Sequence, residues 1–423
     1  MQFSKKIFPN GLRLITVPMK DNPTVTVLVL VEAGSKYETK KINGVSHFLE
    51  HMCFKGTAKR PKSIDIAREL DSIGAHYNAF TSQEFTGYFA KADAKHFKLI
   101  LGIVSDIYLE STLPAEEIEK EKGVIVEEIR MYRDLPQKHI HDVFTELLYG
   151  DQPAGWNIAG TEATVKSFNH SVVRDYRSRH YVAPATAVVI AGNTTTDLAV
   201  GETEKYFQAI SPDVKDGKIG VVENQATPGI KMEDKKTDQT HMVLGVRTFA
   251  LSDKRVAPLR VLENILGGGM SSRLFQRVRE EMGAGYYIGA SADFSSDHGF
   301  FSVSAGVENK RFLEVVSAII GELKNVKISL LPKAELQKAK DHIAGSLYLG
   351  LETSDSIADF YGFQEVMKKK IKTPAEFLEE INKVTAADIL SVANDIFQDA
   401  KLNLAAVGPV GKASGLKDVL RFH

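Results

Sequence analysis

Two histidines four residues apart, with a glutamate directly before the second, are the residues of this sequence best suited to chemistry. His47 and His51 occupy positions i and i+4, so on a helix both imidazoles project from one face and can share a metal ion. Glu50 then lies beside them, where its carboxylate can take a proton from an attacking water without binding the metal. With 12 histidines in 423 residues, about 0.04 patterns of this kind are expected by chance in the whole chain. Because chance so seldom produces the pattern, the sequence predicts a divalent metal site.

The helix expected after Pro114 is the nearest source of a third metal ligand. A catalytic zinc ion takes three protein ligands and keeps one position open. Glu121 and Glu128 are two helical turns apart and share one face, whereas Glu127 points about 100° away from Glu128. The other glutamates of this stretch fit a solvated acidic surface: Glu116, Glu117 and Glu119. The spacing alone leaves the choice of the third ligand open.

Alternating and helical patterns predict the elements that position these residues. β-branched runs at 12–17 and 24–31 predict strands, and residues 44–54 form the helix that carries the histidines. A helix, a strand pair, two further helices and a short buried strand follow: 63–73, 77–90, 95–110, 115–133 and 187–191.

The order of elements begins again after residue 240, which indicates a tandem duplication. The second series comprises a strand, two helices and a strand pair: 241–247, 258–266, 275–282 and 286–307. Where the first copy has its two histidines, the second has Arg260 and Asn264, on either side of Glu263. Only the first copy can therefore bind a metal in this way.

The length of 423 residues exceeds one ordinary core and predicts two domains. Residues 211–240 are rich in Lys, Asp, Gly and Pro with little periodicity, and they predict a linker plus an entering strand. The predicted parts are a catalytic domain, a linker with its strand, and the duplicated domain without a metal motif: residues 1–215, 216–240 and 241–423.

Composition excludes several classes of protein. A net charge of −1 provides no basic excess for nucleic acid, and the single cysteine permits no intramolecular disulfide or thiolate zinc cluster. The sequence has neither an apolar run of about 18 residues nor an exported leader. We therefore expect a soluble cytoplasmic protein with no membrane contact, although a removed presequence would leave no trace.

The run from Gly44 to Thr57, Gly-Val-Ser-His-Phe-Leu-Glu-His-Met-Cys-Phe-Lys-Gly-Thr, resembles the inverted zinc motif of the pitrilysin family, the inverzincins. The roughly 420-residue branch, which includes bacterial processing proteases and the mitochondrial processing peptidase β subunit, is the most similar. The resemblance implies one Zn²⁺ per chain, Glu128 as the third ligand and Glu121 as a support behind the ligands. It also implies an α+β fold of two related domains, each a mostly antiparallel sheet with helices packed on it.

The same resemblance extends to substrate binding. Asn78, Ala79 and Phe80 match the family's edge strand that pairs with the substrate backbone, and Phe54 is expected to contact the substrate as well. The family also has an arginine and a tyrosine that bind the substrate and its developing oxyanion. The resemblance implies that a pair seven residues apart, on either side of Gly283-Ala-Gly285, has these roles here, and a neighbouring arginine and tyrosine are the alternatives. The assigned pair is Arg279 and Tyr286, and the alternatives are Arg277 and Tyr287. The glycine run at 267–269 is no phosphate loop, because no Lys-Ser/Thr follows it.

The resemblance predicts a zinc-dependent endopeptidase, a hydrolase that cuts peptides or unfolded segments inside a clamshell chamber. A chain of this length holds one half of the clamshell, so we expect a homodimer, with a heterodimer of related chains as the other possibility. The main alternative is a non-catalytic scaffold or partner subunit of the same fold. A purely structural zinc module is disfavoured, because a base and an open coordination position would serve no purpose there.

Overall fold

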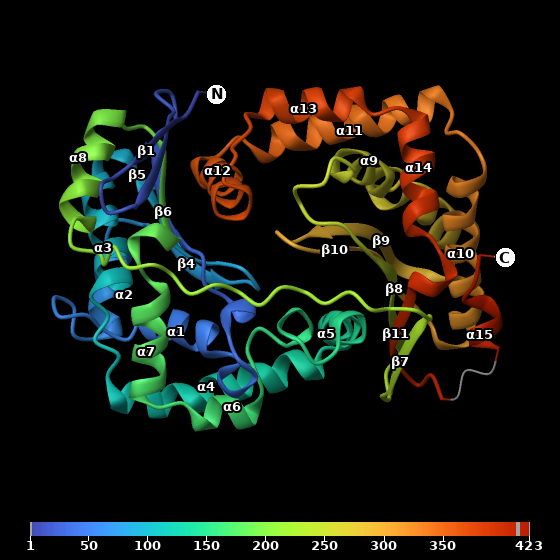
Figure 1. Cartoon of the computed structure of the whole chain (residues 1–423), viewed down its shortest axis with the longest axis horizontal. Helices are drawn as coiled ribbons and strands as arrows, with labels where there is room; N and C mark the ends of the chain where they lie inside the picture. The colour runs from blue at the N-terminus through green and yellow to red at the C-terminus, as the bar shows by residue number, and fades with distance from the viewer. Residues whose placement is uncertain (1, 412–414, 423) are drawn as a thin grey trace. The chain divides into compact units, whose positions relative to one another are not determined.

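The computed structural model of the chain (Figure 1) describes residues 2–411 and 415–422. The chain forms two compact units, each assembled from three segments. The segments are Met1–Ile129, Trp156–Ile219 and Tyr348–Pro374 for unit 1, and Arg130–Gly155, Gly220–Leu347 and Ala375–His423 for unit 2. Each unit contains one mostly antiparallel sheet with helices packed on it, which confirms the predicted α+β fold.

The sheet of unit 1 has six strands in the spatial order β1-β2-β6-β3-β5-β4. Of its pairings, β2–β6 is parallel and the others are antiparallel. The strands are Ser4–Ile7 (β1), Arg13–Pro18 (β2), Thr24–Val31 (β3), His76–Thr81 (β4), Thr86–Asp93 (β5) and Thr186–Gly192 (β6). Within the described part of the chain, β4 has β5 as its one strand neighbour and lies at an edge of the sheet.

Helices cover both faces of this sheet. Val27 and Val29 of β3 point into the core that contains α1 (Val45–Cys53) and α3 (Phe97–Leu109). The alternate residue Leu30 faces the other way, towards α12 (Ser354–Lys368), where a Cβ added at Gly362 would lie 2.7 Å from it. Residues 187–191 of β6 are fully buried, as expected for a short apolar strand that is covered on both sides.

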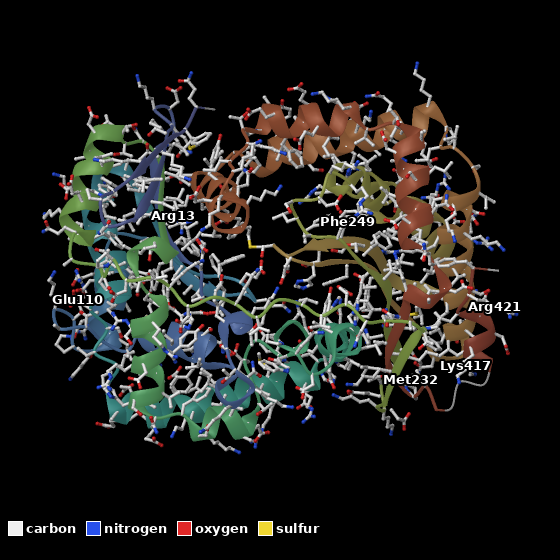
Figure 2. All side chains as sticks on the ribbon, in the orientation of Figure 1. Arg13, Glu110, Met232, Phe249, Lys417 and Arg421 are labelled. Atoms are coloured by element: carbon white, nitrogen blue, oxygen red, sulfur yellow. The ribbon has the colours of Figure 1, made fainter. Side chains whose placement is uncertain are left out.

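Charged side chains hold α12 on this sheet. Arg13 of β2, labelled in Figure 2, donates to Glu32 Oε1 at 2.7 Å and to Glu365 Oε1 of α12 at 3.4 Å. Lys5 Nζ donates to Glu365 Oε2 at 2.8 Å. Because the Glu365 side chain is fully buried, removal of these cations would leave an unpaired charge in the interior.

The sheet of unit 2 has five strands in the order β7-β11-β8-β10-β9, with β7 parallel to β11. The strands are Gly229–Asp234 (β7), Gln239–Thr248 (β8), Gly285–Phe294 (β9), Gly299–Glu308 (β10) and Leu402–Gly408 (β11). Val143 and Phe144 of α5 (Pro136–Tyr149) pack with Val243 and Ala405 of the sheet. A second core contains residues of α9 (Val256–Gly267), α10 (Phe312–Ile328) and α14 (Ala386–Ile396).

The remaining helices connect and cover these sheets. They are α2 (Ser63–Asp71), α4 (Ala115–Asp134), α6 (Glu162–Ser167), α7 (His170–His180), α8 (Thr196–Phe207), α11 (Lys333–Gly350), α13 (Pro374–Lys383) and α15 (Leu416–Val419). Among residues 2–411 and 415–422, no helix combines the length and the apolar character that crossing a bilayer requires.

Two features differ from the sequence expectations. The units are discontinuous, so the continuous parts 1–215, 216–240 and 241–423 do not coincide with them: α5 belongs to unit 2 and α12 to unit 1. The segment predicted as a helix at 275–282 is helical, but it forms a π-helix, Phe275–Glu281, in place of the common α-helix. Periodicity identifies a helix with an apolar face, but it does not state which sheet that face will cover.

Candidate metal centre

Helix α1 carries both histidines of the motif and begins at a fixed point. Gly44 precedes it with a φ of 97°, a conformation that glycine adopts without strain, and a Cβ there would lie 2.5 Å from the Ala159 carbonyl oxygen. The rings of His47 and His51 have their centroids 4.6 Å apart. The helix therefore presents the two imidazoles side by side, as their spacing predicts.

A buried carboxylate caps α1. Glu38 accepts hydrogen bonds from the Gly44 N–H at 2.7 Å, the Ser46 N–H at 2.8 Å and the Asn43 amide at 3.0 Å. The first N–H groups of a helix have no partner within it, and its dipole favours a negative charge there. Burial raises the pKa of Glu38, and the hydrogen bonds act in the opposite direction. Glu38 thereby fixes the start and the direction of α1.

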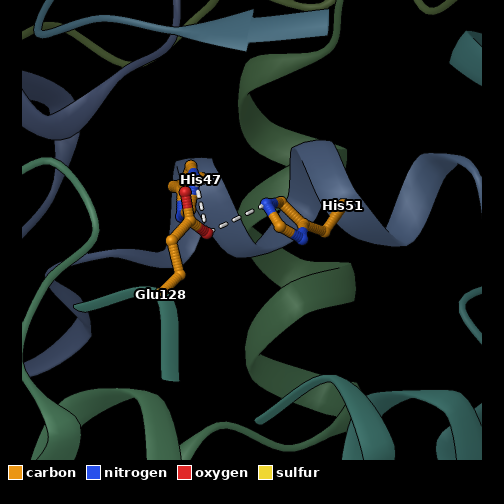
Figure 3. Close-up of side chains that lie close together, drawn as sticks. All are labelled: His47, His51 and Glu128. Carbon is orange, nitrogen blue, oxygen red and sulfur yellow. Dashed lines mark ion pairs between the residues drawn. The ribbon is translucent and has the colours of Figure 1, made fainter. Parts of the chain in front are cut away.

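Helix α4 brings Glu128 to the two histidines (Figure 3). Glu128 Oε2 lies 3.7 Å from His47 Nε2 and 3.6 Å from His51 Nε2. The three residues offer one ligand atom each within 4.8 Å of one another; we call them the metal-ligand cluster. Within the described ranges, no other set of His, Cys, Asp or Glu side chains meets that criterion.

The spacing of these atoms fits one zinc ion. Distances of 3.6 and 3.7 Å are too long for hydrogen bonds. Two donors that are each about 2.1 Å from a tetrahedral zinc ion lie about 3.4 Å apart, and the ion takes this mixture of imidazole and carboxylate ligands. His47, His51 and Glu128 could therefore hold the ion and leave a fourth position open.

The protonation of the histidines differs. Burial, followed by the nearby His51, lowers the pKa of His47 to about 3, which keeps its imidazole neutral and able to donate a lone pair. Burial acts to lower the pKa of His51, but the hydrogen bond to Glu121 and the nearby carboxylates outweigh it and raise this pKa. A bound cation would replace the proton on His51 Nε2.

Glu121 supports the cluster from behind. Its Oε1 lies 2.8 Å from His51 Nδ1, and its Oε2 accepts from Lys55 Nζ at 2.5 Å. With Nε2 of His51 turned towards Glu128, the Nδ1–H donates to Glu121, which fixes the tautomer and the ring orientation. Burial raises the pKa of Glu121, but the hydrogen bonds from His51 and Lys55 outweigh it and lower this pKa. The carboxylate therefore stays charged.

Glu50 lies beside the metal-ligand cluster without being one of its members. Thr81 Oγ1, at the end of β4, donates to Glu50 Oε2 at 2.5 Å. Burial raises the pKa of Glu50, and the Thr81 hydrogen bond and His51 oppose that rise. A carboxylate with a fixed orientation and a raised pKa is suited to proton transfer near neutral pH.

The residues predicted to contact substrate lie on or near the edge strand. Asn78 and Ala79 are consecutive in β4, and the Asn78 side-chain oxygen accepts from the Ala79 N–H at 2.9 Å. Phe80 follows them and is half-buried. Phe54 comes directly after α1, with its ring centroid 6.3 Å from that of Tyr88. The edge position of this strand agrees with the expectation, and its pairing with a peptide stays a prediction.

Arg279 and Tyr286 belong to unit 2, and their roles in binding the substrate stay a prediction. Both side chains are exposed, Tyr286 to 66%. The alternative arginine and tyrosine are engaged with neighbours in unit 2: Arg277 with Glu281 at 2.8 Å and Tyr287 with His241 at 3.1 Å.

Helix α9 holds the positions that match the metal motif in the second copy. The Arg260 guanidinium lies 4.9 Å from the centre of the Phe294 ring, and the Asn264 amide donates to His342 Nδ1 at 2.8 Å. Burial raises the pKa of Glu263 to about 7. The second copy uses these positions for packing and hydrogen bonding.

Three residues that support the site were not singled out from the sequence: Glu38, Lys55 and Thr81. Alternation along residues 77–81 places Thr81 on the same face as Tyr77 and Ala79, and this signal could have identified it as a neighbour of α1. Lys55 is four residues after His51, a spacing that favours contact with the same partner. No comparable signal marks Glu38, because it lies in an irregular segment.

Two family models match the chain. One, described as insulinase (peptidase family M16), matches residues 13–162, and the other, described as the peptidase M16 inactive domain, matches residues 167–343. The first match contains the metal-ligand cluster and Glu50, and the second contains Arg279 and Tyr286.

The chain is also similar along nearly its whole length to individual proteins. A Bacillus subtilis protein named uncharacterized zinc protease YmxG is 35% identical over 405 residues, which cover 95% of this chain and 97% of that protein. A Streptomyces coelicolor protein, also named an uncharacterized zinc protease, is 32% identical over 421 residues, 97% of this chain and 91% of its own. The crystal structure of a protease from Helicobacter pylori has the same fold, with a TM-score of 0.89 at 22% identity over 96% of this chain and 99% of that chain.

Proposed function

We propose, since this chain belongs to the insulinase family of peptidases, family M16, that it is an endopeptidase that uses one zinc ion held by His47, His51 and Glu128. The observation that carries the proposal is the convergence of two imidazole nitrogens and one carboxylate oxygen, with a second carboxylate, Glu50, held beside them. A structural zinc site would need no such base and no open position.

The chain's own groups divide the work of hydrolysis. Zinc, when bound, supplies a Lewis acid that polarises a carbonyl group and lowers the pKa of water. The Glu50 carboxylate accepts a proton from the water whose oxygen attacks the scissile carbonyl carbon. As the C–N bond breaks, Glu50 returns that proton to the leaving amine, and Thr81 keeps the carboxylate in place during both transfers.

The substrate contacts are proposed from the strand geometry. A peptide that pairs with β4 would be bound through its backbone, which gives affinity for many sequences, and its side chains would supply selectivity. In a second chain of the same kind, Arg279 and Tyr286 would contact the substrate carbonyl and the developing oxyanion. We therefore propose a homodimer, in which two chains enclose an extended peptide in a chamber that excludes folded proteins.

Zinc analysis combined with peptide cleavage tests this function. We expect close to one zinc ion per purified chain, cleavage of a mixed library of unstructured peptides, and slow or no cleavage of a native globular protein. A chelator should abolish cleavage, and added zinc should restore it. A chain that contains zinc but cuts no peptide in the library would contradict the proposal and favour the non-catalytic alternative.

A further inference from the structure

Three phenylalanines meet on the face of the first sheet that is opposite the metal-ligand cluster. The Phe80 ring centroid lies 6.2 Å from that of Phe85 and 5.9 Å from that of Phe363, and Phe85 and Phe363 are 5.1 Å apart. Phe80 is on β4, Phe85 is in the turn before β5 and Phe363 is on α12. All three belong to unit 1 and are only partly buried. We call them the aromatic cluster.

Strand alternation separates the aromatic cluster from the metal. Ala79 packs against the core that contains α1, and Thr81 bonds to Glu50 of α1. Successive side chains of a strand point to opposite faces, so Phe80 points to the face that α12 covers. Its ring lies over Gly87 of the neighbouring strand, where an added Cβ would be 2.3 Å from the ring. The glycine thus leaves the space that the ring occupies.

The free edge of β4 has a defined hydrogen-bonding register. The Ser82 N–H donates to the Phe85 carbonyl at 2.8 Å, next to the paired strands. Pairs alternate between bonded and non-bonded along antiparallel strands, so the backbone groups of Ala79 and Thr81 point away from β5. The Ala79 N–H donates to the Asn78 side-chain oxygen, and the carbonyl of a peptide bound to this edge would replace that oxygen. A peptide added to this edge would pair opposite Ala79.

A paired peptide presents alternate side chains to the two faces of the sheet. The peptide residue beside Phe80 points to the same face as Phe80, and cross-strand neighbours are about 5 Å apart. That side chain would therefore meet the exposed parts of the aromatic rings, whereas the residues before and after it would point towards α1. Contact with three partly exposed rings favours a large apolar side chain and disfavours a charge that must lose its water.

We propose that Phe80, Phe85 and Phe363 form a specificity subsite that selects an aromatic or large aliphatic side chain at one position of the bound peptide. The proposal rests on the proposed function, because it requires a peptide on β4. It assigns to α12, which comes from the second half of the chain, a direct part in substrate choice.

Matched peptides test the subsite. Each peptide of the series contains one phenylalanine among Gly, Ser and Ala residues, and the position of the phenylalanine differs from peptide to peptide. Each peptide is cut at one bond, and kcat/KM is measured for each with the zinc-loaded wild type. We expect one placement to be preferred by roughly tenfold or more over glycine there, and Phe363→Ala to reduce that ratio to near one. Gly87→Ala, which must displace the Phe80 ring from β5, should reduce the same ratio without any change in α12.

Phe360→Ala is the matched control, because Phe360 lies on the same helix and its ring packs with Tyr361 instead. It should keep the wild-type preference. Phe363→Leu should retain a preference for large side chains, which separates loss of apolar surface from damage to the fold. Thermal unfolding of each variant identifies any that is not folded, and in that case Phe363→Leu and Gly87→Ala decide the question.

A binding assay separates failure of this inference from failure of the proposed function. Fluorescence anisotropy with the labelled phenylalanine and glycine peptides is measured on Glu50→Gln chains that carry the aromatic cluster intact, and again with Phe363→Ala added. We expect the affinity difference between the two peptides to disappear with the second substitution. Equal affinities before that substitution, or a preference that survives both Phe363→Ala and Gly87→Ala, would overturn the subsite. No cleavage and no binding of any peptide by the wild type would instead overturn the proposed function.

Discussion

Glu127 and Glu128 are adjacent residues of the same type, and only the direction of their side chains separates them. Glu128 points to the histidines, at 3.6 and 3.7 Å from their Nε2 atoms, whereas Glu127 is exposed on another side of α4. We expect Glu128→Gln to weaken zinc binding by at least about a hundredfold and Glu127→Gln to leave it nearly unchanged, because an amide is a poor ligand for this ion. Competition with a zinc indicator measures both affinities, and the reverse result would move the third ligand by one residue.

Glu50 should affect turnover without affecting metal content. Glu50→Gln keeps the size of the side chain and an acceptor for Thr81, but it cannot take a proton. We expect kcat to fall on the order of a thousandfold, within the usual range for a general base, while the zinc content stays at one ion per chain. An empty site in this variant would mean that Glu50 is itself a ligand.

The sequence predicted the local part of the site and left the distant part to family resemblance. His47, Glu50 and His51 lie within five residues, so helical geometry alone relates them. Glu128 is far away along the chain, and spacing on its own helix could only narrow the choice to a shared face with Glu121. Thr81 and Glu38 touch α1 through tertiary packing, which no local pattern encodes.

At the scale of elements, the contribution of the Glu38 cap to the stability of α1 can be tested. Glu38→Gln replaces a carboxylate that accepts from two helix N–H groups with an amide whose nitrogen cannot accept. We expect the free energy of unfolding to fall by about 1–3 kcal/mol, measured by urea denaturation. Glu116→Gln, which alters an exposed glutamate of α4, is the control, and an equal effect of both changes would show that the cap is unimportant.

Helix α9 carries a pH-dependent contribution to stability through Glu263. Burial raises its pKa from 4.5 to about 7 in the folded chain, so the fold favours the protonated acid. Its contribution is complete below the unfolded value and is lost as the pH rises through the window from 4.5 to about 7. We expect Glu263→Gln, which stays neutral, to stabilise the protein by about 1–3 kcal/mol at pH 8, with a much smaller gain at pH 5.

Thermal unfolding of the wild type and Glu263→Gln at both pH values checks this sign. Glu280→Gln serves as the control, because Glu280 is exposed in the same unit. A Glu263→Gln variant that is less stable than the wild type at pH 8 would contradict the burial of a neutral acid at this position.

The elements around the site were predicted well where their patterns are strong. The helix expected at 44–54 is α1, Val45–Cys53, and the strand pair expected across 77–90 is β4 and β5. The sequence did not identify the short β1, whose residues are all exposed, or β11, whose position depends on pairing with β7 and β8. Exposed strands lack an apolar alternation, and strands completed by distant partners lack a local signal.

At the scale of the whole molecule, the shared active site is the proposal that mixing of chains tests most directly. Glu50→Gln chains lack the base, and Tyr286→Phe chains lack the proposed oxyanion contact. In a homodimer whose sites take residues from both chains, an equal mixture that exchanges freely should regain about a quarter of the wild-type activity, because half of the dimers contain one intact site. Activity no higher than that of the two variants alone would refute the shared site.

The discontinuous units also determine when each sheet can be finished. The last strand of the first sheet, β6, ends at Gly192, but the helix that covers its second face ends at Lys368 of a 423-residue chain. During translation, Leu28, Leu30 and Val189 therefore leave the ribosome long before Gly362 can shield them. The nascent chain must carry this apolar surface through the synthesis of Gly220–Leu347, the longest segment of the second unit, and that interval is when it is most exposed to aggregation and most in need of a chaperone.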